Sequence, residues 1–220
     1  MRKEPLRARR SRRFVASALA VSAASALLCI NGCSNRSDSP SVVLSAVDSQ
    51  VQSAQDVQAT RVERGKYLVT VLGCNDCHTP FKMGENGPEP DMSRMLAGHP
   101  QEIGELSPPE LKEPWIWAGT GTNTAFAGPW GVTYAFNLTP DNHTGLGIWT
   151  EEMFIKALRT GKHFGEARQI QPPMPWPWFS HLTDEDLKSV YAYLRSIPPI
   201  QNMVPDYQPP PKPARAASAP

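Results

Sequence analysis

The sequence predicts a small all-α domain whose helices are separated by long loops. Three segments combine helix-capping residues with apolar residues at helical spacing, and strand signals between them are sparse. The chain of 220 residues contains 23 prolines and 15 glycines, and those between the three segments predict irregular loops. A Cys-Asn-Asp-Cys-His run at residues 74–78 is the most specific motif in the chain.

Residues 1–32 are interpreted as an export signal, because a basic start is followed by the uncharged segment Phe14–Ile30. That segment is long enough for the apolar part of a signal and short for a membrane span. A permanent anchor helix is the alternative, which the Ala- and Ser-rich composition disfavours. The run Ile30-Asn31-Gly32-Cys33 looks like a bacterial lipobox, apart from Asn31, so we expect a lipid on Cys33 that anchors the protein to a membrane.

The chain after this signal divides into three parts. Residues 33–60 are polar and contain no aromatic side chain, which predicts a flexible tether. Residues 61–200 have the length of a single folded domain. Residues 201–220 are rich in proline and alanine, and we expect this tail to be disordered.

Removal of the signal leaves an acidic protein. Seven of the 22 basic and one of the 21 acidic side chains lie before residue 33, so the remaining 15 and 20 give a formal charge of −5. This charge does not support a nucleic-acid partner. It suits a protein partner with a basic surface.

Two helices are predicted in the first and middle parts of the domain. Glu63–Leu72 is mostly apolar after Gly65 and leads directly into the cysteine motif. Glu151–Thr160 has Thr150 as its N-cap and Gly161 as its C-terminal stop.

The third predicted helix has the clearest pattern. Thr183 is its N-cap, and the acidic run Asp184–Asp186 occupies the first turn, where the helix dipole favours negative charge. Pro198 ends it. Its apolar residues repeat at helical spacing at Leu187, Val190, Tyr191 and Leu194.

The motif at residues 74–78 is typical of covalent haem attachment. Cys74 and Cys77 are about one helical turn apart and can each form a thioether with the porphyrin, while His78 can bind the iron. Half a zinc site and a redox dithiol are the alternatives. The other two cysteines, Cys29 and Cys33, lie in or beside the export signal, and no βαβ pattern accompanies the motif. One motif predicts one covalent haem c.

Several runs together carry a family resemblance: Arg64-Gly65-Lys66-Tyr67-Leu68, the cysteine motif, a late Met-Pro, Leu182 to Leu187 and Tyr191-Ala192-Tyr193-Leu194. They resemble class I cytochrome c. Asn137 to Asp141 and Gly145 to Thr150 are similar to the cytochrome c domains of bacterial membrane-bound dehydrogenase complexes that oxidise alcohols, aldehydes or related substrates. The resemblance implies a small cytochrome c fold, with helices around one haem. Those subunits usually carry several haems, which favours a stand-alone carrier here.

The resemblance also implies an iron ligand opposite His78. Met174 lies in a proline-rich run shortly before the third helix, and the flanking prolines restrict the loop. The alternatives are a methionine that only fills the core and a second histidine as the ligand. Those histidines are His99, His143, His163 and His181.

Other contacts to the haem are expected from the same comparison. The family orients its haem-binding histidine with a proline carbonyl, and Pro88 occupies the matching place. Trp130, Tyr134 and Asn137 can donate hydrogen bonds to buried haem propionates, with packing in the core as their alternative role.

These expectations together predict a function. The chain is expected to be a periplasmic mono-haem cytochrome that carries single electrons between a dehydrogenase or quinol-oxidising complex and a terminal acceptor. No arrangement for a substrate reaction is evident, so we expect a carrier and not an enzyme. The alternatives are a haem-containing subunit, or a haem enzyme or gas sensor with a labile distal ligand.

Overall fold

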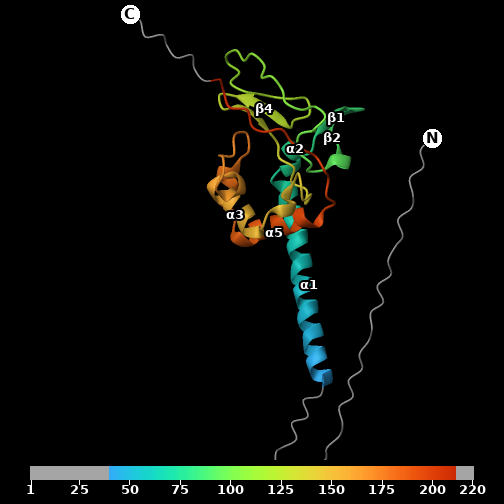
Figure 1. Ribbon diagram of the computed structural model, residues 1–220. Coiled ribbons are helices and arrows are strands. Elements are labelled where there is room, and N and C mark those ends of the chain that lie inside the picture. The colour runs from blue at the N-terminus through green and yellow to red at the C-terminus, as the bar shows by residue number, and fades with distance from the viewer. Residues whose placement is uncertain (1–39, 212–220) are drawn as a thin grey trace, which may run out of the picture.

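The computed structural model describes residues 40–211, with side-chain detail from residue 50 onward (Figure 1). Its α-helices are α1 (Pro40–Val71), α2 (Cys74–His78), α3 (Glu151–Thr160), α4 (Trp176–Phe179) and α5 (Asp184–Ser196). Its strands are β1 (Phe81–Gly84), β2 (Gly87–Pro90), β3 (Ala118–Gly119), β4 (Ala125–Gly128) and β5 (Gly131–Tyr134). Short 3₁₀ helices are η1 (Met92–Arg94), η2 (Leu146–Ile148) and η3 (His163–Gly165).

The domain is mixed α/β, so the all-α prediction was wrong. Strands β1 and β2 form an antiparallel hairpin, and β3, β4 and β5 form a second antiparallel sheet. The strands have two to four residues and are rich in glycine and alanine, so they are too short to show the alternation that predicts a strand. Gly131, the first residue of β5, has a φ of 100°, a conformation that favours glycine.

Helices α1 and α5 cross at a glycine. A Cβ atom on Gly65 would lie 1.9 Å from the carbonyl oxygen of Ser189, so only glycine lets the two backbones approach this closely. Ion pairs flank the crossing, with Arg64 Nε 2.9 Å from Asp186 Oδ1 and Arg61 Nη2 3.2 Å from Glu185 Oε2. Leu68 and Val69, which follow Gly65 along α1, are buried.

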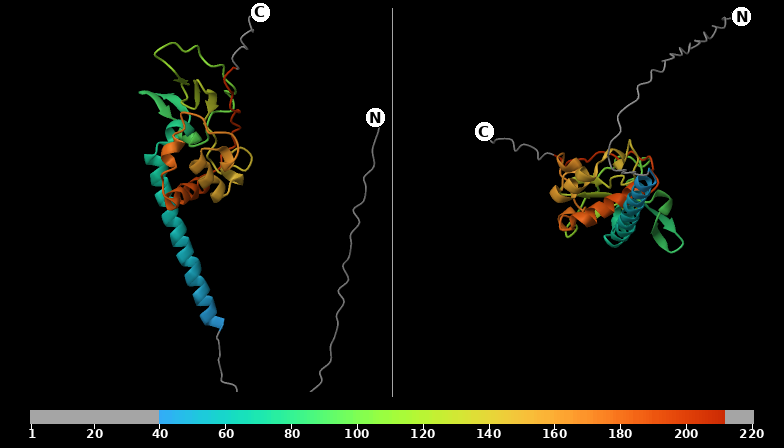
Figure 2. Two further views of the ribbon diagram at one scale, coloured as in Figure 1. Left: turned by 90° about the vertical axis from the view of Figure 1, so that its left-hand side faces the viewer. Right: turned by 90° about the horizontal axis from the view of Figure 1, so that it is seen from below.

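Helix α1 is much longer than predicted. The expected helix began at Glu63, whereas α1 begins at Pro40, so the expected flexible tether is helical from residue 40 to residue 60. Residues 50–60 are exposed, and this part of α1 projects from the domain in Figure 1 and in the left-hand view of Figure 2. The tether was predicted from the polar composition of this segment. A projecting helix needs no apolar face, and the Ala and Gln residues here are good helix formers.

Helices α3 and α5 confirm the predictions for them. Thr150 Oγ1 accepts a hydrogen bond from Met153 N, and Gly161 ends α3 with a φ of 66°. Thr183 Oγ1 likewise accepts from Asp186 N at the start of α5. These side-chain caps satisfy backbone N–H groups that a helix leaves free.

Two apolar clusters form the core. The larger joins α1, α3 and α5 and includes Leu146, Phe154, Leu158, Leu187, Val190 and Leu194. The smaller lies on the three-stranded sheet and contains Ala125, Ala127, Val132 and Tyr134.

The start of the predicted disordered tail is ordered. Asn202 is 1% exposed, its amide nitrogen donates to the carbonyls of Ala97 and His99, and its amide oxygen accepts from Gln101 N. Gln208 exchanges two backbone hydrogen bonds with Val132 on β5. The domain therefore continues past residue 200, because buried polar groups hold a segment whose composition alone suggested disorder.

The expected export signal, residues 1–32, and Cys33 lie outside the described residues. Within residues 40–211, no helix has both the length and the apolar character needed to cross a membrane.

Candidate functional site

Helix α2 presents the cysteine motif on a single turn. Gly73, with a φ of 69°, separates α2 from α1, and Asp76 N donates to its carbonyl. The motif is held from its other end as well, because Gly98 N donates to the His78 carbonyl over 2.7 Å. Cys74 and Cys77 are free thiols and are only partly exposed.

His78 is oriented by a backbone carbonyl, but not by the one expected. Its Nδ1 lies 2.7 Å from the carbonyl oxygen of Phe136, which leaves Nε2 as the ring nitrogen available to a ligand. The expected Pro88 is exposed on β2, opposite Met83. The β1–β2 hairpin directs Pro88 outward, and the chain after β5 supplies the acceptor instead.

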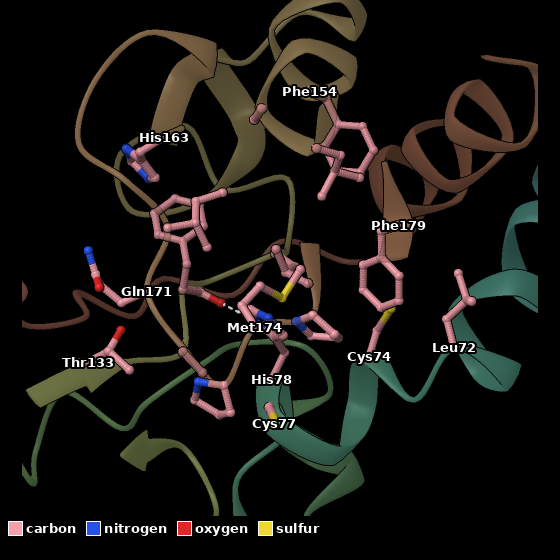
Figure 3. Close-up of a pocket in the computed structure, with 18 of the residues that line it drawn as sticks. Leu72, Cys74, Cys77, His78, Thr133, Phe154, His163, Gln171, Met174 and Phe179 are labelled. Atoms are coloured by element: carbon pink, nitrogen blue, oxygen red, sulfur yellow. Dashed lines mark hydrogen bonds between the residues drawn. The ribbon is translucent and has the colours of Figure 1, made fainter. Parts of the chain in front are cut away.

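A pocket of about 360 Å³ opens in front of the motif (Figure 3). This volume is within the range of about 300–1,000 Å³ that is typical of small-molecule and cofactor sites. Figure 3 shows Cys74, Cys77, His78 and Met174 around it. Apolar side chains form most of the remaining wall: Leu72, Phe136, Leu138, Leu146, Phe154, Leu158, Ile170, Phe179, Leu182, Val190 and Leu194.

Burial sets the protonation of the motif. It raises the pKa of the Cys74 thiol to about 12 and also raises the pKa of the Cys77 thiol, with the charge of Asp76 adding to both. Burial lowers the pKa of His78. At neutral pH the imidazole is therefore neutral, which is the form that binds a metal.

Met174 is the methionine that lines the pocket. Met83, Met92 and Met203 are exposed, and Met153 is 40% exposed on α3. The loop before α4 carries Met174 into the pocket, together with Gln171 and Pro173.

Of the four histidines considered as alternative iron ligands, one lines the pocket and three do not. His99 is fully buried outside the pocket, with Nδ1 2.9 Å from Thr124 Oγ1 and Nε2 3.1 Å from the Gly104 carbonyl. His143 and His181 are exposed. His163 lines the pocket beside Phe136 and Trp149, so within residues 50–211 it is the histidine besides His78 that can reach a bound group.

Of the three expected propionate donors, Asn137 and Tyr134 have other hydrogen-bond partners, and Trp130 lies outside the pocket. Asn137 is fully buried, and its amide nitrogen donates to Thr144 Oγ1 and to the Ile200 carbonyl. Tyr134 lines the pocket, and its hydroxyl accepts from Leu106 N. Trp130 does not line the pocket and instead covers Gly128 in the β4–β5 turn. The sequence showed that these side chains can donate hydrogen bonds, but not which partners or positions the fold gives them.

The pocket contains polar groups to which the sequence assigned no role, apart from His163 as an alternative iron ligand. Trp149, His163, Arg168 and Gln171 line it, and Phe136 contributes its carbonyl to His78. The place of Trp149 in the stretch that carries the family resemblance was the sequence signal that could have pointed to it. A backbone acceptor such as Phe136 leaves no trace in the residue types, because every residue has a carbonyl.

The residues of the pocket fit a covalently bound haem. Two thiols and a neutral imidazole lie at one side, Met174 offers a thioether, and the wall between them is apolar. Among the described residues, no group of three or more His, Cys, Asp or Glu side chains could hold a metal ion by itself.

Comparisons with known proteins find cytochrome subunits of dehydrogenases. The chain is 31% identical over 166 residues to the cytochrome c subunit of alcohol dehydrogenase (quinone) from Gluconobacter oxydans, covering 74% of the chain and 27% of that protein. It is 32% identical over 133 residues to the fructose dehydrogenase cytochrome subunit from Gluconobacter japonicus, covering 60% of the chain and 20% of that protein. It is 38% identical over 156 residues to the alcohol dehydrogenase (quinone) cytochrome c subunit of Gluconacetobacter polyoxogenes, covering 70% of the chain and 25% of that protein.

These relatives confirm the family resemblance. The chain spans about a quarter of the length of the relatives it matches. No protein-family profile matches it.

Proposed function

We propose that this chain, which is similar to the cytochrome c subunits of bacterial dehydrogenases, is a mono-haem c-type cytochrome that carries single electrons. The observation that supports this most directly is the pocket itself, since Cys74, Cys77 and His78 face the same apolar space as Met174. A haem bound there supplies one-electron chemistry at its iron. The chain itself is not proposed to catalyse a substrate reaction.

Each residue has a defined task in this proposal. Cys74 and Cys77 would hold the porphyrin through thioethers, and His78 would bind the iron through Nε2. Met174 would be the second iron ligand. The Phe136 carbonyl keeps the His78 ring in one orientation and one tautomer, because it accepts from Nδ1. The apolar wall excludes water, which favours the less charged, reduced state of the iron.

The proposed location is the bacterial periplasm, at a membrane surface. A lipid on Cys33 would anchor the chain, and the part of α1 before Arg61 would add a spacer of about 30 Å at about 1.5 Å per residue. The proposed partners are a dehydrogenase or quinol-oxidising complex as donor and a terminal acceptor. They would lie within reach of a domain held at that distance.

The names of the relatives favour a second candidate, a fixed haem subunit of a dehydrogenase. A fixed subunit should co-purify with its dehydrogenase in mild detergent, while a carrier should separate from it. A shorter α1 should slow electron delivery by a carrier without changing its haem spectrum.

Haem retention tests the proposal. After export in a host that attaches haem, the denatured protein should keep its haem through acid–acetone extraction, because thioether bonds survive unfolding. Replacing both Cys74 and Cys77 with alanine should abolish retention. Extraction of haem from the wild type would overturn the assignment.

Ligation distinguishes the carrier from a haem enzyme or gas sensor. The oxidised protein should show the weak near-infrared charge-transfer band of a sulfur ligand, and Met174→Ala should remove it. Met153→Ala, which changes a methionine outside the pocket, should retain it. A wild type without this band that readily binds carbon monoxide would favour the enzyme or sensor.

A further inference from the structure

Consecutive apolar side chains are exposed in the loop that leads into β3. Trp115, Ile116 and Trp117 are 74%, 65% and 44% exposed. A hollow of about 420 Å³ lies among residues 114–119. Single apolar residues are common on protein surfaces, whereas a contiguous group of them marks an interaction site, and tryptophan is enriched where protein interfaces bind most strongly. Residues 114–117 therefore have the composition of an interface.

The loop that carries residues 114–117 is fixed at both ends. Leu106 N donates to the Tyr134 hydroxyl over 2.7 Å, and the Leu106 side chain packs on the smaller apolar cluster. At the other end, β3 pairs with β4. Trp115 N donates to the Lys112 carbonyl over 2.9 Å, which closes a turn. The apolar side chains are thus held on an anchored loop, which lowers the entropy cost of binding a partner.

The exposed residues also lie next to the cofactor pocket. The ring centroids of Trp117 and Phe126 are 6.2 Å apart, with the planes at 57°. Phe126 is 4% exposed and lines the pocket. Phe126 therefore links residues 114–117 to the space that a haem would occupy. Because electron tunnelling slows steeply with distance, a redox partner bound at this place would be well positioned.

Acidic side chains flank residues 114–117. Glu105, Glu110 and Glu113 are exposed, and Lys112 is the basic residue among them, so three negative charges and one positive charge give this stretch a formal charge of −2. None of the three glutamates forms an ion pair with another described residue. This charge favours a partner with a basic rim and disfavours a surface of anionic lipids.

The place of the loop in the domain also favours a protein partner over a membrane. In Figure 1 and in the left-hand view of Figure 2, the yellow-green loop before β3 and the projecting part of α1 lie at opposite ends of the domain. With the N-terminal end of α1 held at a membrane, as proposed above, residues 114–117 face away from that membrane.

We propose that residues 114–117 and the acidic residues beside them dock a basic redox protein, which exchanges one electron with the bound haem past Phe126. The partner would present an apolar patch with lysine or arginine around it. In each encounter the reduced cytochrome loses one electron and the oxidised partner gains it, and no bond forms or breaks. The inference rests on the proposed function and adds to it the surface that meets the partner.

Binding of a soluble basic cytochrome c, with lysines around its haem edge, tests this surface. In titration calorimetry of the haem-loaded protein at low salt, the Kd should rise about tenfold when Trp115 and Ile116 are both replaced by alanine, as expected for the loss of central interface residues. Replacing Glu110 and Glu113 with glutamine should weaken binding and reduce its dependence on salt. In stopped-flow experiments, electron transfer from the reduced protein to this acceptor should slow in both variants.

Matched double variants outside the loop are the controls. Trp178→Ala with Ile148→Ala removes two apolar side chains that are 76% and 64% exposed. Glu63→Gln with Glu152→Gln removes two exposed negative charges on α1 and α3. Both controls should leave the Kd and the rate unchanged. Weaker binding in the Trp178 and Ile148 variant, with no change in the loop variants, would place the docking surface elsewhere and overturn the proposal.

The possible failures are distinct. If haem is retained but the wild type does not bind the basic cytochrome, or the loop variants bind and react as the wild type does, the docking surface is wrong and the cytochrome assignment stands. Vesicles of phosphatidylcholine and phosphatidylglycerol test the membrane alternative with the haem-loaded Cys33→Ser protein. If the paired alanine substitutions weaken vesicle binding and leave the rate unchanged, residues 114–117 contact lipid and the proposal is wrong. If the wild type retains no covalent haem, the proposed function itself is wrong.

Discussion

Single buried polar residues hold the loops of this protein in place. Asn202 links the C-terminal segment to the loop after η1 through four hydrogen bonds, with Ala97, His99, Gln101 and Arg94 as partners. Asn137 similarly joins Thr139, Thr144 and Ile200. Long loops with little secondary structure need such contacts, since their backbone groups have no regular partners.

Asn202→Ala should lower the free energy of unfolding by about 2–4 kcal/mol, because it leaves several buried groups without a partner. Urea unfolding of the haem-loaded protein, followed by circular dichroism, measures this. Gln55→Ala on the exposed part of α1 is the control and should have no effect. Equal stability of the two variants would show that water replaces the lost bonds.

His99 should make stability depend on pH. Burial lowers its pKa in the folded state, with the Gly104 carbonyl opposing. The unfolded chain therefore binds the proton at a higher pH, near the ordinary pKa of about 6.5. The stability that neutral His99 provides is complete above this pH and is lost as the pH falls toward the folded pKa.

Urea unfolding of the wild type and His99→Gln at several pH values tests this. The difference in their free energies of unfolding should be largest above neutral pH and should shrink in acid. His143→Gln, at an exposed position, should show no such trend. A difference that grows as the pH falls would contradict the assigned neutral state.

At the level of elements, the crossing of α1 and α5 organises the site. It packs α1, which leads into α2 and its cysteine motif, against α5, the helix that supplies Val190 and Leu194 to the pocket wall. The close approach depends on Gly65, where any side chain would meet the Ser189 carbonyl.

Gly65→Ala should therefore force the two helices apart and cost about 3 kcal/mol, at the upper end for an overpacked core site. Thermal unfolding of the haem-loaded protein measures the loss. Gly121→Ala is the matched control, since a Cβ there meets no atom within 4 Å. If both variants melt at the same temperature, the helices can adjust their crossing without cost.

The whole molecule has a projecting N-terminal helix and a packed C-terminal segment (Figures 1 and 2). Residues 50–60 of α1 are exposed, whereas Asn202 and Gln208 connect the last segment to the domain. The stability of the domain should therefore depend on the segment with Asn202 and Gln208 and not on residues 50–60 of α1.

Two truncations test this asymmetry. Joining residues 1–32 directly to Arg61 should leave the melting temperature of the domain within about 2 °C of the wild type, because few contacts are lost. Ending the chain at Ile200 should lower it by more than about 5 °C, since buried bonds to Asn202 and the Gln208 bridge disappear. A large loss from the first truncation would show that the projecting helix packs against something else.

The sequence by itself determined the features that depend on neighbouring residues. The caps Thr150 and Thr183 predicted α3 and α5, because a helix end is satisfied by groups within one turn. The spacing of Cys74, Cys77 and His78 predicted a haem-attachment motif from five consecutive residues. The family resemblance predicted Met174 as the second ligand, and Met174 does line the pocket.

Only the tertiary structure decided which distant groups meet. Phe136 and not Pro88 supplies the carbonyl for His78, and His163 and Trp149 line the pocket, while Asn137 binds the C-terminal segment. The short strands and the ordered residues after Ile200 were missed as well. In each case the partner is far along the chain, and the contact depends on how the loops close around the core. Residue type shows that a group can form a hydrogen bond, and the fold selects the partner.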